Sequence, residues 1–194
     1  MPNIDPRQIN GPWTEGYTLD LHSTGSIFLG YDEFGHERFE TKRTEMGELL
    51  YRLKYKSDQT VISTIAGTIA DFVRKWKIGI DVIVPTPPTR MRRTQPLFQI
   101  CEAVAGRVNV PVLKSAIRKT GKTTELKDLH EYFARREALK GSMQVDLRLV
   151  EGKRILLIDD LMRSGATMSA AAEELMASRA KAVYALALTQ TRRV

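Results

Sequence analysis

Residues 154–167 read RILLIDDLMRSGAT, and this stretch decides the fold. The four aliphatic residues 155–158 form a short apolar run, which predicts a strand that is buried in a sheet. Two carboxylates, Asp159 and Asp160, follow the run directly, and the small-residue loop 164–167 then leads into a helical stretch. This order of strand, acidic pair, loop and helix predicts a ligand-binding edge of an α/β sheet.

The rest of the chain continues the same alternation. Apolar residues at helical spacing predict helices, and short β-branched runs predict strands. The expected order is helix 45–56, helix 60–77, strand 81–87, helix 94–108, strand 110–118, polar segment 119–141, strand 153–160, helix 166–180 and strand 181–190. Strands that alternate with helices predict an α/β fold, with a mainly parallel sheet flanked by helices.

The first 44 residues have a different pattern. Apolar and polar residues alternate between 17 and 42, and turn signals stand at 23–25 and 32–35. The segments YTLDLHS, SIFLGYD and HERFETK therefore predict a small N-terminal antiparallel β meander. We expect a decorating segment at residues 1–44 and the main domain at residues 45–194.

Ligands of parallel sheets bind at the carboxyl ends of the strands, which selects the loops 85–93 and 159–167. Carboxylates at the second loop can bind sugar hydroxyls or hold Mg²⁺, directly or through water. The backbone amides from Ser164 to Thr167 can bind an anion at the start of a helix. A ribose 5-phosphate would satisfy both parts, although a helix cap is the favoured explanation for Thr167 taken alone.

The loop resembles the signature of type I phosphoribosyltransferases. The family pattern of four aliphatic residues, two acids and a Thr/Ser-Gly-x-Thr loop is present as ILLIDDLMRSGAT. Three further strings follow the family order and resemble ComF-type phosphoribosyltransferases, a family associated with DNA uptake: LLYRLKYKSD, DVIVPTPPTRMRRTQP and IRKTGKTTELKDL. The resemblance covers roughly residues 45–192 and implies the type I phosphoribosyltransferase fold.

That family transfers 5-phosphoribosyl from phosphoribosyl pyrophosphate (PRPP) to a nitrogenous acceptor and releases pyrophosphate, with Mg²⁺ as cofactor. The resemblance implies that Asp159 and Asp160 are the catalytic residues, orienting the ribose and holding the metal. It assigns the 5-phosphate to Arg163, Ser164, Gly165, Ala166 and Thr167. It assigns pyrophosphate to Thr86, Pro87, Pro88, Arg90, Arg92 and Arg93. The expected partners are PRPP and a small-molecule acceptor, and a homodimer is compatible with this picture.

The residue types of the first loop fit pyrophosphate independently of the resemblance. Arg90, Arg92 and Arg93 bring three guanidinium groups to the end of a strand, and guanidinium binds phosphate oxygens in a bidentate manner. The alternative is a proline-rich turn with solvated arginines. Lys54 is open in the same way, as a surface lysine or as a further pyrophosphate contact.

The polar segment 119–141 is long for a connection without clear structure, and such segments are often functional. The resemblance implies a flexible loop that closes over the reaction, with Arg118, Lys119 and Lys122 following the pyrophosphate. A solvated charged helix is the alternative.

The chain departs from the family pattern at three places. ComF-type chains usually carry an N-terminal cysteine zinc module, whereas Cys101 is the only cysteine in this sequence and stands in an apolar stretch typical of a buried helix. Arg163-Ser164 replaces the usual Thr-Thr, and Glu125 stands where glutamine is usual. These changes keep PRPP binding and leave the acceptor and a role in DNA uptake open.

Composition narrows the remaining classes of function. The 194 residues carry a net charge of +7, which favours anionic partners without choosing among them. The sequence has no signal-peptide pattern and no apolar run long enough for a membrane span, so we expect a cytoplasmic protein. Nucleic acid is not favoured, because the basic residues are not interleaved with aromatic ones.

Two other functions have to be weighed against a transferase. A PRPP- or nucleotide-sensing protein without transferase activity would use the same fold and the same loops. The string AIRKTGKT at residues 116–123 approaches a P-loop, but Ala116 stands where the first glycine is needed. We therefore predict a phosphoribosyltransferase rather than a P-loop NTPase.

Overall fold

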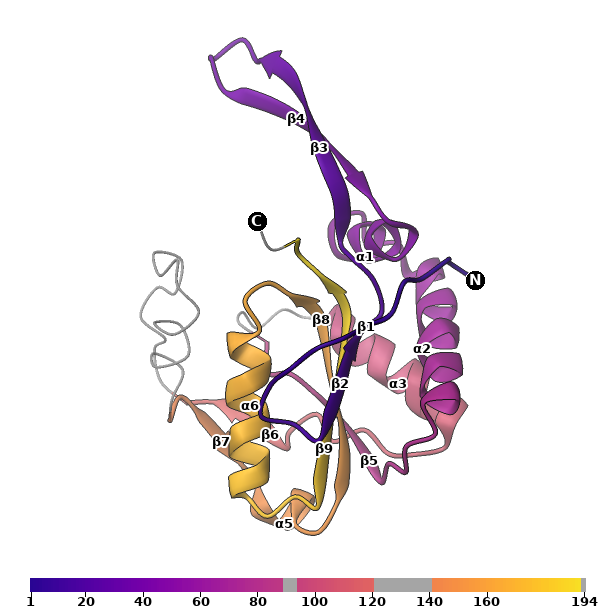
Figure 1. Cartoon of the computed structure of the whole chain (residues 1–194), viewed down its shortest axis with the longest axis vertical. Helices are drawn as coiled ribbons and strands as arrows, with labels where there is room; N and C mark the ends of the chain where they lie inside the picture. Colours follow the sequence, from indigo (N-terminus) through magenta and orange to yellow (C-terminus); the bar gives the residue numbers. More distant parts are fainter. Residues whose placement is uncertain (89–93, 121–140, 193–194) are drawn as a thin grey trace.

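The computed structural model describes residues 1–88, 94–120 and 141–192 (Figure 1). The helices are α1 (Glu45–Tyr55), α2 (Ile62–Trp76), α3 (Pro96–Val108), α5 (Leu147–Val150) and α6 (Ala166–Ala177), and the 3₁₀ turn η1 (Gln59–Val61) precedes α2. The strands are β1 (Arg7–Gln8), β2 (Glu15–Thr18), β3 (Ser23–Tyr31), β4 (Glu37–Arg43), β5 (Val82–Pro85), β6 (Ile117–Lys119), β7 (Met143–Val145), β8 (Arg154–Met162) and β9 (Ala182–Gln190).

A central sheet with the strand order β1-β2-β9-β8-β5 organises the described part of the chain. Strands β2, β9, β8 and β5 are parallel, and β1 adds to the edge in the antiparallel sense. Leu157 in β8 lies between Val84 in β5 and Ala185 in β9, so the acidic strand is central rather than at an edge. The predicted mainly parallel sheet is confirmed.

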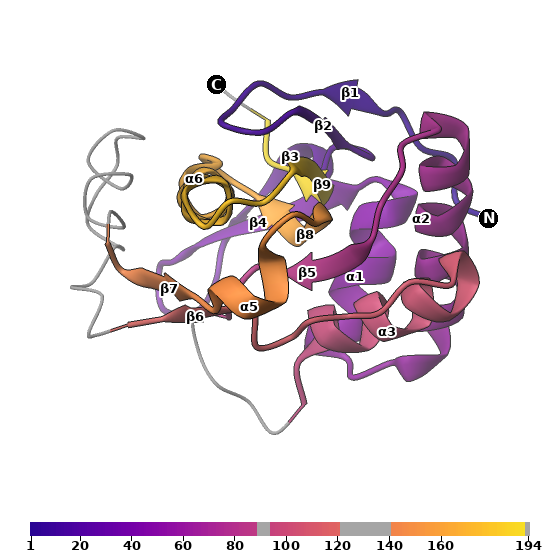
Figure 2. The same cartoon turned by 90° about the horizontal axis from the view of Figure 1, so that it is seen from below.

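Helices cover both faces of this sheet, with α6 on one side and α1, α2 and α3 on the other (Figure 2). Because side chains of a strand alternate between faces, Ile155 and Leu157 enter the core beneath α6. Leu156 and Ile158 enter the core against the three other helices. Burial on both faces explains why residues 155–158 form a continuous apolar run.

The helices follow their sequence signals. Thr44 caps α1 by accepting a hydrogen bond at 3.0 Å from the amide of Gly47. Pro96 stands at the first turn of α3, where its missing N–H is harmless. Cys101 is fully buried in α3 and burial raises the pKa of its thiol, so the prediction that it is a core residue is confirmed. None of the helices in the described residues is long and apolar enough to cross a membrane.

The N-terminal region differs from the predicted three-stranded meander. Only β3 and β4 pair with each other, and this hairpin projects from one end of the body (Figure 1). The first predicted strand is in fact β2, which pairs in parallel with β9 and completes the central sheet. The open edge of β9 offers a buried position, and Thr18 and Leu19 are both fully buried there. Local alternation identified a strand but not its partner.

The predicted strand at residues 110–118 is mostly wrong. Val112 makes only an isolated parallel bridge with Ile83. The end of the segment instead forms β6, which pairs with β7 in a separate antiparallel sheet. Pro111 has no N–H to donate, which limits the ladder that this apolar run can form beside β5.

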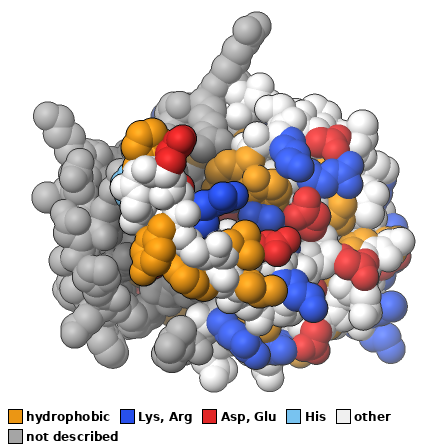
Figure 3. Space-filling view, turned by 90° about the horizontal axis from the view of Figure 1, so that it is seen from above, with side chains coloured by type: hydrophobic (Ala, Val, Ile, Leu, Met, Phe, Trp, Pro, Cys, Tyr) orange, Lys and Arg blue, Asp and Glu red, His pale blue; other side chains and the backbone are white. Residues whose placement is uncertain are grey.

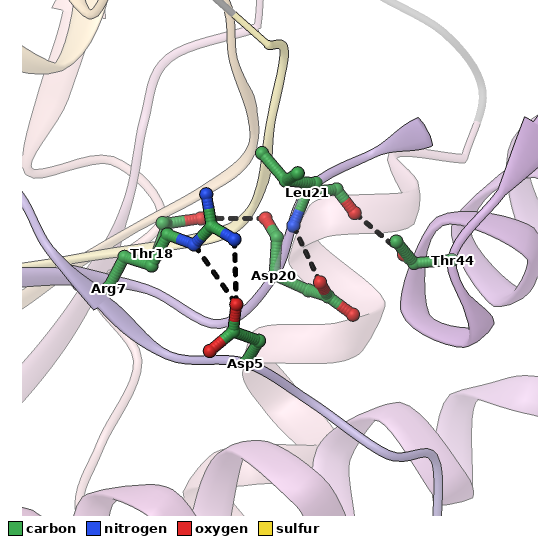
Figure 4. A network of polar contacts seen from close by, with 6 residues as sticks. All are labelled: Asp5, Arg7, Thr18, Asp20, Leu21 and Thr44. Atoms are coloured by element: carbon green, nitrogen blue, oxygen red, sulfur yellow. Dashed lines mark hydrogen bonds and ion pairs between the residues drawn. The ribbon is translucent and has the colours of Figure 1, made fainter. Parts of the chain in front are cut away.

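A group of polar contacts fixes the base of the hairpin to the body (Figure 4). Thr18 Oγ1 donates to the carbonyl of Asp20 at 3.1 Å, and the amide of Leu21 donates to Asp20 Oδ1 at 2.7 Å. Thr44 Oγ1 then donates to the carbonyl of Leu21 at 2.6 Å. Leu21 also bridges to Gln190 of β9, so the hairpin starts from a rigid joint at the end of the sheet.

Candidate functional site

The carboxyl ends of β5 and β8 bring two predicted loops together. Pro85 pairs with Ile158, which places the next residue of each strand side by side. Thr86 donates its amide to the carbonyl of Ile158 at 2.9 Å and its hydroxyl to Asp159 Oδ1 at 2.8 Å. The first predicted loop is therefore in direct contact with the acidic pair.

Lys54 joins the site from the last turn of α1. Its Nζ lies 2.7 Å from Asp160 Oδ2, and both side chains are about one quarter exposed, at 23% and 22%. Sequence alone left Lys54 undecided between surface and site. The ion pair places it at the site, within reach of the space beside the two carboxylates.

The two carboxylates differ in their electrostatics. Burial, and next the negative charge of Asp160, raise the pKa of Asp159 to about 7. The hydrogen bond from Thr86 and the charge of Lys54 oppose this rise. Burial also lowers the pKa of Lys119, while the nearby charge of Asp159 acts in the opposite direction. Burial therefore disfavours the charged form of Asp159, and a cation bound beside this carboxylate would favour it.

The loop after β8 turns sharply into α6. Gly165 has φ of +81°, a backbone conformation that favours glycine, and it is the residue that precedes the helix. Thr167 lies inside the first turn of α6, so it is not the helix cap. The first amides of a helix have no intrahelical partner, and they are suited to binding an anion.

A cleft of about 690 Å³ joins these parts. The sequence-predicted residues that line it are Thr86, Pro87, Pro88, Asp159, Asp160, Arg163 and Thr167, and Lys54 lines it as well. Ser164 and Gly165 instead line a neighbouring cleft of about 440 Å³, and Ala166 is buried. The side chains of the predicted phosphate loop are thus divided between two neighbouring clefts and the core.

The other predicted residues have different outcomes. Arg90, Arg92, Arg93 and Lys122 lie outside the described residues, as does Glu125. Lys119 is partly buried and senses the charge of Asp159, whereas Arg118 precedes it on β6 and is exposed on the other face. Of these two residues, Lys119 is therefore the one that interacts with the charge of the acidic pair.

Several residues that sequence reasoning missed also line the cleft: Tyr55, Gln95, Pro96, Leu97, Phe98 and Leu161. Tyr55 and Phe98 give it aromatic walls. The sequence held one indication of these residues, because Tyr55 is an aromatic residue next to Lys54 at the end of a predicted helix. Phe98 follows Pro96 at the start of α3, and its helical pattern predicted only core packing.

Part of the chain matches a known protein family. Residues 99–192 match the family model described as the phosphoribosyl transferase domain. The matched segment contains β8, the acidic pair, the loop and α6. The chain has the type I phosphoribosyltransferase fold. The expectation from the sequence is thereby confirmed at the level of the fold.

Solved structures support the same fold at low sequence identity. Adenine phosphoribosyltransferase of Trypanosoma brucei aligns with a TM-score of 0.51 and 16% identity, over 95% of this chain and 74% of that one. The Giardia lamblia enzyme aligns at 0.50 and 16%, over 85% and 81%. Glutamine PRPP amidotransferase of B. subtilis aligns at 0.51 and 15%, over 88% of this chain but only 36% of that protein. No curated protein matches the sequence.

Proposed function

We propose that the protein binds PRPP with Mg²⁺ and transfers its 5-phosphoribosyl group to a nitrogenous small molecule, with release of pyrophosphate. The main support is a single cleft that is lined by residues from four parts of the fold: Lys54 of α1, Thr86 after β5, Asp160 of β8 and Thr167 of α6. The phosphoribosyl transferase domain match over residues 99–192 supports this class of reaction. The finer ComF-like assignment rests on the sequence strings alone.

Each part of the cleft has a role in this proposal. Asp159 and Asp160 bind the ribose hydroxyls, and Thr167 with the amides at the start of α6 binds the 5-phosphate. Thr86 and Lys54, which contact Asp159 and Asp160 respectively, serve the pyrophosphate. Ion pairing with Asp160 keeps Lys54 in place, and an arriving pyrophosphate offers Lys54 a second anionic partner.

The residues present fit a magnesium ion. Asp159 and Asp160 are hard oxygen ligands, and burial, followed by the charge of Asp160, raises the pKa of Asp159, so a bound cation would favour its charged form. No group of three or more His, Cys, Asp or Glu side chains in the described chain could form a protein cage for a metal. This matches Mg²⁺, which usually keeps waters and takes the rest of its ligands from one or two carboxylates and substrate phosphates. When bound, the ion would offset negative charge on the departing pyrophosphate.

The reaction itself needs no protein nucleophile. The bond from ribose C1 to the pyrophosphate oxygen breaks, and its electron pair leaves with pyrophosphate. A nitrogen lone pair of the acceptor forms the new bond to C1, and the acceptor proton passes to solvent. The residues of the cleft hold the two reactants and stabilise the changing charge, and Tyr55 and Phe98 offer flat surfaces for a planar acceptor.

Calorimetric titration with PRPP, with and without Mg²⁺, tests the first half of the proposal. We expect binding that depends on Mg²⁺, and an absence of binding under both conditions would contradict it. A screen of nitrogenous bases and amines for pyrophosphate release tests the second half. Binding without release for every acceptor would favour a PRPP-sensing protein instead.

A further inference from the structure

The β3–β4 hairpin carries a set of exposed hydrophobic side chains that the proposed function does not use. It extends beyond the body of the molecule (Figure 1), and Figure 3 looks down on this end, where hydrophobic side chains lie at the surface beside basic ones. Their exposed fractions range from 49% to 76%, and they are Ile27, Phe28, Leu29, Tyr31, Phe34 and Phe39.

Three of these side chains form an aromatic face on the hairpin. Phe28 pairs with Phe39 across the strands, with ring centroids 5.5 Å apart, and contacts Tyr31 at 5.4 Å. Each ring remains about half exposed or more. The face is therefore ordered by its own contacts but is not covered by the rest of the described chain.

An isolated two-stranded hairpin is at best marginally stable in water. In the described part of the chain, β3 and β4 form a sheet of their own without a third strand. A long ribbon with open edges and large exposed side chains also invites aggregation. A partner that covers the aromatic face would stabilise the hairpin and remove its large exposed side chains from water.

Exposed charges of both signs lie along the hairpin, with Arg38 beside Glu37 and Glu40 near Lys42, but acidic residues predominate at the tip and basic ones at the base. Glu33 and Glu37 are exposed at the tip. At the base, Lys42 is exposed and Arg192 donates to the carbonyl of Thr24 at 3.2 Å. Two such hairpins packed in opposite directions would place each acidic tip against a basic base.

We propose that the partner is a second copy of this chain, and that two hairpins pack antiparallel through their aromatic faces about a two-fold axis. Such an axis makes every contact occur twice, which suits a ribbon whose tip and base are complementary. The acidic tip disfavours nucleic acid or an anionic membrane as the partner.

The available area fits a modest dimer interface. At about 200 Å² for each large side chain, the six hydrophobic residues of one hairpin expose on the order of 700 Å², and the three residues of the aromatic face expose about half of that area. The largest apolar patch of a typical monomer covers roughly 300–600 Å², and a standard interface buries about 800 Å² on each partner. The aromatic face would be the hydrophobic centre of the interface, and the polar and charged side chains along the ribbon would have to supply the rest of its area.

Sedimentation or light scattering of the full chain across a concentration series tests the proposal. We expect a dimer, and the double variant Phe28→Thr/Phe39→Thr should weaken the association by roughly 30-fold or more, since central aromatic contacts dominate interfaces. Threonine favours strands, so the hairpin itself should persist. Unchanged thermal unfolding of the body and unchanged PRPP titration are the controls for folding.

A charge exchange then tests the antiparallel arrangement. Glu33→Lys/Glu37→Lys changes the tip, and Lys42→Glu changes the base. Each variant alone should dimerise about threefold to tenfold more weakly than the original chain, because rim charges contribute modestly. An equimolar mixture of the two should form a heterodimer close to the original affinity, since both tip–base contacts then join opposite charges.

Three outcomes would overturn the inference. The first is a chain that stays monomeric up to about 200 µM, a concentration at which even a weak interface is populated. The second is a dimer that the aromatic double variant leaves intact. The third is a mixture of the charge variants that associates no better than each variant alone. Because the hairpin residues are not part of the cleft, each result is independent of whether PRPP binds.

Discussion

The two ends of β8 each bring an aspartate together with a cationic side chain, but the two contacts differ in kind. At the amino end, Asp81 accepts hydrogen bonds from the Arg154 side chain at 2.7 Å and 3.1 Å and from its backbone amide at 2.8 Å. These bonds hold the pKa of Asp81 well below its ordinary value. The charged form of this carboxylate is therefore stabilised by folding.

At the carboxyl end, the balance is reversed for Asp159. It accepts a hydrogen bond from Thr86 at 2.8 Å, yet burial and the charge of Asp160 raise its pKa to about 7. Lys54 pairs with Asp160 rather than with Asp159. The charged form of Asp159 is therefore disfavoured until something else enters the site.

The difference separates a structural contact from a proposed binding site on the same strand. A satisfied carboxylate adds stability and has no capacity left for a ligand. A carboxylate with a raised pKa costs stability in the free protein, and a ligand that supplies positive charge or hydroxyl donors can offset that cost. The carboxyl end is also where the proposed phosphate loop begins, which agrees with this distinction.

The largest effect is expected for Asp160→Asn at the carboxyl end. Loss of this charge should weaken Mg²⁺-dependent PRPP binding at least tenfold, about 1.4 kcal/mol. Calorimetry measures the change, and Asp81→Asn at the amino end serves as the matched control with nearly unchanged affinity. Equal affinities for the original protein and Asp160→Asn would remove the central claim.

The loop after the carboxyl end should show a graded response to ribose 5-phosphate. We expect Thr167→Val to lose most of the affinity, because Thr167 lines the cleft in the first turn of α6. Arg163→Thr should lose a smaller part, about 1 kcal/mol, that decreases with added salt. Lys153→Ala, before the amino end of β8, is the control and should change nothing.

The reverse order would exclude a backbone phosphate nest. If Arg163→Thr abolished binding and Thr167→Val left it intact, a single cation would account for the affinity. Isothermal titration at two ionic strengths distinguishes the two cases.

The free protein should become more stable when the disfavoured charge is removed by Asp159→Asn. Because the pKa of Asp159 is raised, folding favours its protonated form. This favourable contribution to the free energy of unfolding is complete below the ordinary pKa of 3.8 and is lost as the pH rises to about 7. The melting temperature of the variant should thus match the original near pH 4 and exceed it by roughly 2–8 °C at pH 8. Thermal scans in a metal chelator measure this, and a lower melting temperature at pH 8 would contradict it.

The sequence predicted the parts of this comparison that depend on local pattern. The apolar run 155–158 identified a buried strand, and the acidic pair behind it lies at the carboxyl edge of the sheet, as its position in the sequence indicated. Helical spacing likewise located α1, α2, α3 and α6 within a few residues. These features are local because burial on two faces and helix periodicity leave a direct trace in the order of residues.

Other features depend on partners that are distant in sequence. The strand pattern near Tyr17 does not reveal that β2 joins β9 rather than the following hairpin. Lys54 reads as a surface lysine until α1 places it 2.7 Å from Asp160. The opposite characters of Asp81 and Asp159 likewise arise from burial and neighbours, which no local pattern specifies.

The smallest effect is expected at the amino end, where Asp81→Asn should act in the opposite direction to Asp159→Asn. Because the pKa of Asp81 is lowered, folding favours its charged form. This favourable contribution to the free energy of unfolding is present above the ordinary pKa of 3.8 and is lost as the pH falls below it. Asparagine keeps an oxygen for the amide of Arg154, so the substitution removes mainly the charge. Both side chains are about one third exposed or more, and solvent screening limits the effect to roughly 1–3 °C in melting temperature at pH 7. The difference should decrease toward pH 3, and a stabilising effect at pH 7 would show that the two ends of β8 do not differ as described.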